Sequence, residues 1–149
     1  MLRFEKSIVI SAPVEEVFAF AADPSHLPEY FTEVREVKDM RRLPNGGYAC
    51  TLMPVELTTE TSELVPNERI VSRGSWCGGL DDVTMTTTFE RLDGGQTRVT
   101  WHEEHAFHGG FFGRVGEKST AGYLERAAEM TLAALKVRIE AGIPATASA

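Results

Sequence analysis

The first thirty residues change from a strand pattern to a helix pattern. Residues 4–11 alternate between apolar and polar positions, which predicts a strand with one better-buried face. Apolar residues then recur at the spacing of an amphipathic helix, at Val14, Val17, Phe18 and Ala21. Pro13 suits the first turn of this helix, and the helix ends before Pro24, because a residue that precedes proline avoids the helical conformation. A second short helix is predicted over residues 26–32.

The middle of the chain predicts a meander of antiparallel strands. Strand patterns cover residues 34–42, 48–64, 70–76, 83–91 and 97–107. The Asn-Gly-Gly run at 45–47 and the Asp-Gly-Gly run at 93–95 supply the positive-φ positions that tight hairpins need. Pro54 lies inside the longest strand pattern, so we expect that strand to be bent there or to lie at an edge of the sheet.

Residues 117–141 predict one long helix with an unusually wide apolar surface. At 100° per residue, the charged side chains share a narrow arc of the helix surface. The rest of the surface is broadly apolar and has two flanks. One flank holds Leu124, Ala128, Leu132, Leu135 and Ile139, and the other holds Tyr123, Ala127, Met130, Ala134 and Val137. We expect a curled sheet to cover both flanks. Small residues in mid-arc, namely Thr120, Ala127 and Thr131, either line a cavity or pack as ordinary core residues.

Composition limits the class of protein. The chain has 149 residues, of which 42% are hydrophobic and 25% charged, so we expect a single domain with a flexible tail over residues 142–149. A net charge of -7 argues against nucleic acid as a partner. No apolar run reaches 18 residues, so we expect no stable membrane insertion and a cytoplasmic location. Cys50 and Cys77 do not form a disulfide framework or a zinc motif. A monomer and a homodimer both remain open.

The run SIVISAPVEEVFAFAADPSHLPEY, residues 7–30, resembles the opening of the START-like helix-grip superfamily (SRPBCC), in its polyketide cyclase/dehydrase and lipid-transport branch. The resemblance implies an α+β helix-grip fold: a seven-stranded curved antiparallel sheet wrapped around a long C-terminal helix, with two short helices after strand 1. It also implies an internal hydrophobic cavity. Members of the superfamily bind lipids, sterols, quinones, plant hormones or polyketides, and some catalyse cyclisation.

Candidate catalytic chemistry lies on the last predicted strand, where Trp101, Glu103 and His105 share one face. Burial is expected to raise the pKa of the Glu103 carboxyl and to lower that of the His105 imidazole, so the pair could exchange a proton near neutral pH. Alternatively, both side chains pair with neighbours. We expect no metal and no cofactor, because the segment 102–105 is one residue short of the HExxH motif and lies on a strand.

Further candidates would contact a hydrophobic ligand. They are aromatic, sulfur-containing or small side chains: Tyr30, Trp76, Met85, Phe89, Trp101, Phe107, Thr120, Tyr123, Ala127, Met130 and Thr131, with Phe111 and Phe112 at the mouth of the cavity. The glycine-flanked segment 109–113 is predicted to be a hinged flap, and residues 77–80 a second access loop.

Three functions follow as hypotheses. The first is a carrier or sensor that binds a hydrophobic small molecule such as a lipid, a quinone or a polyketide. The second is an aromatase/cyclase-like enzyme that uses Glu103 and His105, with Arg73 or Tyr123, on a carbonyl substrate. The third is a protein-binding regulatory module, which a filled cavity and an exposed Phe111–Phe112 patch would favour.

Overall fold

The computed structural model of the chain describes residues 1–31, 36–44, 48–53, 57–76 and 81–148. The predicted turn at 45–47, Pro54 and the access loop at 77–80 lie outside these described residues. In chain order the elements are β1 (Leu2–Ile10), α1 (Val14–Ala22), the 3-10 turn η1 (Pro24–His26), α2 (Leu27–Tyr30), β2 (Glu36–Arg42), β3 (Tyr48–Met53), β4 (Leu57–Val65), β5 (Arg69–Trp76), β6 (Asp81–Leu92), β7 (Gln96–Phe107) and α3 (Phe111–Ser148).

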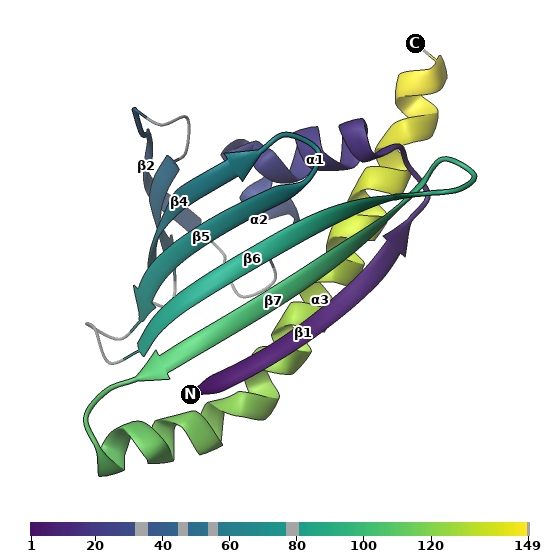
Figure 1. The fold of residues 1–149 in the computed structure, drawn as a ribbon. Helices are drawn as coiled ribbons and strands as arrows, with labels where there is room; N and C mark the ends of the chain where they lie inside the picture. Colours follow the sequence, from purple (N-terminus) through teal and green to yellow (C-terminus); the bar gives the residue numbers. More distant parts are fainter. Residues whose placement is uncertain (32–35, 45–47, 54–56, 77–80, 149) are drawn as a thin grey trace.

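The seven strands form one antiparallel sheet in the order β1-β7-β6-β5-β4-β3-β2. The register shifts between Lys38 and Arg41 in β2, and between Thr61 and Glu63 in β4. Such irregularities bend a strand and increase its twist. The sheet is curved, and α3 runs diagonally across it beside β1 (Figure 1). The short helices α1 and α2 lie on the same side of the sheet, and both contact α3. The predicted helix-grip architecture is confirmed.

Three predicted boundaries are wrong. One is the end of the long helix: α3 continues to Ser148, beyond the predicted end at residue 141 and into the predicted tail over residues 142–149. Residues 48–64 form two strands, β3 and β4, and this division accounts for the seventh strand. The long helix begins at Phe111 rather than at residue 117, so the segment 111–113 belongs to a helix and is not a loop flap. Gly109 and Gly110 make the turn out of β7 with φ values of 93° and 59°, and the Gly110 carbonyl accepts the first helical hydrogen bond from the Arg114 amide.

The apolar core lies between α3 and the concave face of the sheet. Side chains from β1, β6 and β7 pack there with those of α1 and with one flank of α3: Leu124, Ala128, Leu132, Leu135 and Ile139. On the β1 side, the Lys6 ammonium pairs with Glu125 and Glu129 of α3, and the Lys136 ammonium donates to the Val9 carbonyl at 2.8 Å. These contacts hold the charged arc of the helix against β1.

Three of the five residues on the other flank of α3 are exposed. Tyr123 is 49% exposed, Met130 59% and Val137 67%. The prediction that both flanks are covered is therefore wrong for these three residues. The physical reason is that α3 packs on β1 and β7 with one face and meets α2 with another, so its wide apolar arc is larger than the surface these elements bury.

Candidate functional site

A small cavity lies under α2 on the concave face of the sheet. Its volume is about 50 Å³, and its lining is mostly apolar. The walls come from α1, α2, β5, β6, β7 and α3: Ala21, Leu27, Tyr30, Phe31, Ile70, Ser72, Met85, Thr87, Trp101 and Leu135. Three of the predicted ligand contacts, Tyr30, Met85 and Trp101, are among them. The fold thus brings together residues that are far apart in the sequence.

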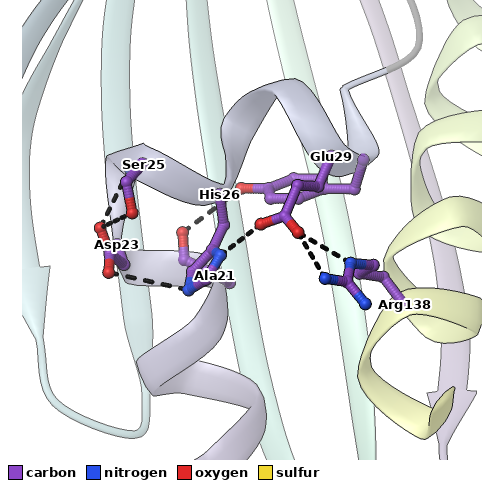
Figure 2. Close-up of polar contacts among 7 residues, drawn as sticks. Ala21, Asp23, Ser25, His26, Glu29 and Arg138 are labelled. Carbon is purple, nitrogen blue, oxygen red and sulfur yellow. Dashed lines mark hydrogen bonds and ion pairs between the residues drawn. The ribbon is translucent and has the colours of Figure 1, made fainter. Parts of the chain in front are cut away.

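Surface contacts hold α2 above this cavity (Figure 2). The Glu29 carboxylate accepts a hydrogen bond from Arg138 Nε of α3 at 2.8 Å, and a terminal nitrogen of the same guanidinium forms an ion pair with it at 2.7 Å. It also contacts the His26 ring, and the hydrogen bonds from His26 and Arg138 lower the pKa of Glu29. The Tyr30 hydroxyl donates to the Ala21 carbonyl at 3.4 Å. These contacts orient α2 so that its apolar side chains face the sheet.

A larger groove of about 450 Å³ lies between α1, η1 and the end of α3, and it is open to solvent. Phe20 and His26 form one wall, where their rings stack with centroids 4.0 Å apart, and Glu16 and Arg138 also border it. Because the groove is more open and is bordered by charged side chains of both signs, it suits an apolar ligand less well than the cavity under α2 does.

A buried hydrogen-bonded array extends from the cavity wall along β7. The Trp101 indole donates to Glu103 Oε1 at 2.7 Å. His105 contacts Glu103 Oε2 through Nε2 at 2.7 Å and Asp81 Oδ2 through Nδ1 at 2.6 Å. All four side chains are buried, and the imidazole lies between the rings of Phe4 and Phe107. We call Asp81, His105, Glu103 and Trp101 the buried array.

The strand register explains this arrangement. In the pairing of β6 with β7, Met85 is opposite Glu103 and Val83 is opposite His105. Asp81 is therefore the diagonal neighbour of His105 on the same face, within reach of a long side chain. Sequence reasoning missed Asp81, because it began this strand at residue 83. The available signal was that Asp81 continues the alternation of Val83, Met85 and Phe89.

The predicted direction of the His105 pKa is wrong. Burial lowers the pKa of this imidazole, but hydrogen bonds and charges from Asp81 and Glu103 outweigh it and raise the pKa to about 9. His105 is thus an imidazolium at neutral pH, and both of its N–H groups are donated to carboxylates. Neither ring nitrogen has a lone pair free to accept a proton, so this geometry fits the alternative of pairing with neighbours better than proton exchange between Glu103 and His105 near pH 7.

The other predicted ligand contacts lie in several places. Phe89 is buried against Phe18, with ring centroids 5.2 Å apart. Ala127 and Thr131 are buried on α3, whereas Phe107 is half-buried next to His105. The remaining described candidates do not line the cavity and are exposed: Phe111, Tyr123 and Met130. Arg73 is exposed as well. The side chains of Trp76, Phe112 and Thr120 lie outside the described part of the structure.

Within the described ranges, no group of three or more His, Cys, Asp or Glu side chains is arranged to hold a metal ion. In the same ranges, no helix has both the length and the apolar character needed to cross a bilayer.

The fold and the covered concave face define a helix-grip protein. Residues 1–140 match the model of the family described as polyketide cyclase / dehydrase and lipid transport. The chain belongs to this family. No curated protein matches it in sequence.

Solved structures with the same fold are distant in sequence. The Zhui aromatase/cyclase from Streptomyces sp. R1128 superposes with a TM-score of 0.80 at 15% identity, covering 93% of each chain. A conserved protein from Geobacillus kaustophilus gives 0.72 at 16% identity, over 93% of this chain and 95% of that one. A protein from Thermus thermophilus gives 0.71 at 22% identity, over 94% and 98%. At these identities the likeness concerns the fold alone.

Proposed function

We propose that this protein binds a hydrophobic small molecule between α2, α3 and the concave face of the sheet. The observation that carries the proposal is the cavity under α2, whose walls are mostly aromatic and apolar and carry three hydroxyl groups, those of Tyr30, Ser72 and Thr87. Apolar walls with few polar groups are typical of small-molecule sites. The family description, which includes lipid transport, supports the same class of function.

The cavity must widen when such a ligand binds. Its volume of about 50 Å³ is well below the roughly 300 Å³ or more of typical ligand sites. Two features allow widening. Met85 has an unbranched, adaptable side chain, and α2 is held to α3 by the Glu29–Arg138 ion pair, whose side chains are 30% and 49% exposed. Exposed pairs contribute about 1 kcal/mol or less, so this ion pair opposes a small shift of α2 only weakly.

A second candidate function is a protein-binding module. The small cavity favours it, as does the exposure of Phe111, 73%, and Val115, 49%, near the start of α3. Individual exposed apolar residues are nevertheless common on protein surfaces. We therefore rank ligand binding first. Acid–base catalysis by Glu103 and His105 has less support, because both imidazole nitrogens are already hydrogen-bonded to carboxylates.

The test is to fill the cavity and to compare the result with the same change outside it. Thr87 lines the cavity, whereas its neighbour Thr88 is exposed on the other face of β6. Thr87→Phe places a ring in the cavity and should weaken binding of the neutral dye Nile red by about tenfold or more, equivalent to about 1.4 kcal/mol. Thr88→Phe should bind the dye as the wild type does.

Native mass spectrometry of the purified protein, followed by organic extraction, would identify any bound apolar compound. Equal dye affinity for Thr87→Phe and the wild type would contradict ligand binding in this cavity. If the dye does not bind at all, while Phe111→Ala removes a measured protein interaction, the second candidate function is supported instead.

A further inference from the structure

The buried array contains a carboxylate oxygen that has no partner. Asp81 Oδ2 contacts His105, but Asp81 Oδ1 is buried and has no hydrogen bond among the residues that the structure describes. The Asp81 side chain is only 7% exposed. Leaving a buried carboxylate oxygen without a donor is unfavourable, so the environment of Oδ1 favours a group that can donate a hydrogen bond to it.

All the donors within the array are already used. The Trp101 N–H is directed at Glu103, and the two N–H groups of the imidazolium are directed at Glu103 and Asp81. These four side chains can therefore form further hydrogen bonds only as acceptors, through their carboxylate oxygens. Two carboxylates with one imidazolium between them also carry one net negative charge. A hydroxyl or ammonium group is therefore attracted to the array, and a carboxylate is repelled.

The array adjoins the proposed ligand cavity. Trp101 and Met85 line the cavity, and Met85 is directly opposite Glu103 in the register of β6 and β7. Glu103 thus lies immediately beyond the cavity wall. Asp81 is four residues from Met85 along β6, which corresponds to roughly 13 Å of strand. For its end group to reach both carboxylates, a long, narrow ligand in the cavity must displace packed side chains along this direction, just as it must widen the cavity itself.

We propose that the buried array is the polar end of the ligand site, and that it selects elongated hydrophobic ligands with a hydroxyl or ammonium end group over those with a carboxylate. This inference rests on the proposed function. Asp81 and Glu103 act in it as specificity-determining residues, and His105 and Trp101 position their carboxylates. Long-chain alcohols and amines belong to the favoured ligand class, and fatty acids to the disfavoured one.

The test uses four probes that share a ten-carbon chain: decan-1-ol, decylamine, 1-methoxydecane and decanoate. Each competes with Nile red for the wild-type protein near pH 7. The alcohol and the amine should bind at least about tenfold more tightly than the ether, as expected for a hydrogen bond to a charged group. Decanoate should bind most weakly.

Asp81→Asn removes one negative charge with little change of shape. This substitution should reduce the preference for the amine over decanoate by about tenfold or more, because the array loses one buried negative charge. The matched control is Asp82→Asn: Asp82 is exposed and contacts His108 at 2.7 Å, so its substitution should leave the order of affinities unchanged.

The outcomes separate the two proposals. If neither Nile red nor any of the probes binds, the proposed function fails. If the probes bind but decanoate equals the alcohol, or if the ether equals the alcohol, the selectivity inference is overturned and the proposed function stands. Thermal melting shows whether Asp81→Asn is folded. If it is not, the order of affinities in the wild type decides the question alone.

Discussion

At the scale of single residues, His105 shows how neighbours reverse the effect of burial. A buried imidazole on its own is expected to be neutral. Here two carboxylates lie within 2.7 Å of its ring nitrogens, one from the adjacent strand and one from the same strand, and they stabilise the charged form. His105 is completely buried and still carries a raised pKa of about 9. This residue therefore links the stability of the fold to pH.

We expect the contribution of His105 to the free energy of unfolding to be lost at alkaline pH. The pKa in the folded protein, about 9, lies above the ordinary value of 6.5, so the contribution is fully present below pH 6.5 and is lost as the pH rises through 9. Its size is at most a few kcal/mol, since each pKa unit corresponds to about 1.4 kcal/mol. Urea denaturation between pH 6 and pH 10 measures it.

The control for this prediction is His102→Gln, because His102 is only half-buried and lies on the opposite face of β7. The His102→Gln variant should keep the wild-type pH dependence of the free energy of unfolding. The His105→Gln variant should lose the part of that dependence that comes from His105. Among the four histidines, NMR should show His105 titrating near pH 9. A midpoint for His105 near 6.5 would contradict the assignment.

At the scale of elements, α3 shows that an apolar face in a sequence is not always a buried face. Leu132 and Met130 are two residues apart and both belong to apolar flanks of the helix. Leu132 is 2% exposed and packs in the core, whereas Met130 is 59% exposed. Which flank is buried depends on where β1, β7 and α2 meet the helix.

We therefore expect two similar truncations in α3 to differ strongly in effect. Leu132→Ala should lower the free energy of unfolding by about 2–5 kcal/mol, because it leaves a cavity in the core. Met130→Ala should change it by no more than about 0.5 kcal/mol. Alanine favours the helix in both cases, so helix propensity does not explain a difference. Urea denaturation would measure both values, and a similar loss in the two variants would show that the Met130 flank is covered in solution.

At the scale of the whole molecule, the core joins elements from both ends of the chain. Phe4 and Ile10 of β1 pack in the same cluster as Leu132 and Ile139 of α3. The amide of Ser11 also donates to Glu140 at 2.9 Å, across 129 positions of sequence. Since the first strand and the last helix share one core, we expect the chain to unfold as one domain.

The expected result is a single cooperative unfolding transition. Tryptophan fluorescence and far-UV circular dichroism should give coincident curves in urea, as they do for small two-state domains. Fluorescence reports on the surroundings of Trp76 in β5 and Trp101 in β7, and circular dichroism reports mainly on the long helix. Two separated midpoints would contradict the single-domain prediction and would indicate that the helix or part of the sheet unfolds independently.

The sequence by itself determined most of the architecture. The period-two pattern of residues 4–11, the helical spacing after Pro13 and the glycine turn at 93–95 are local signals, and each corresponds to an element in the structure. Local periodicity specifies these elements because side-chain direction repeats every two residues in a strand and every 3.6 in a helix. The same signals could not specify that residues 48–64 divide into two strands.

Only the tertiary structure decided the chemistry of the site. Asp81 and His105 are 24 residues apart, and they meet because the register of β6 with β7 makes them diagonal neighbours. That contact reverses the predicted direction of the His105 pKa, since electrostatic interactions depend on distance in space rather than on separation along the chain. For the same reason the exposed flank of α3 was not predictable: it depends on which elements pack against the helix, and no single segment of the sequence contains that information.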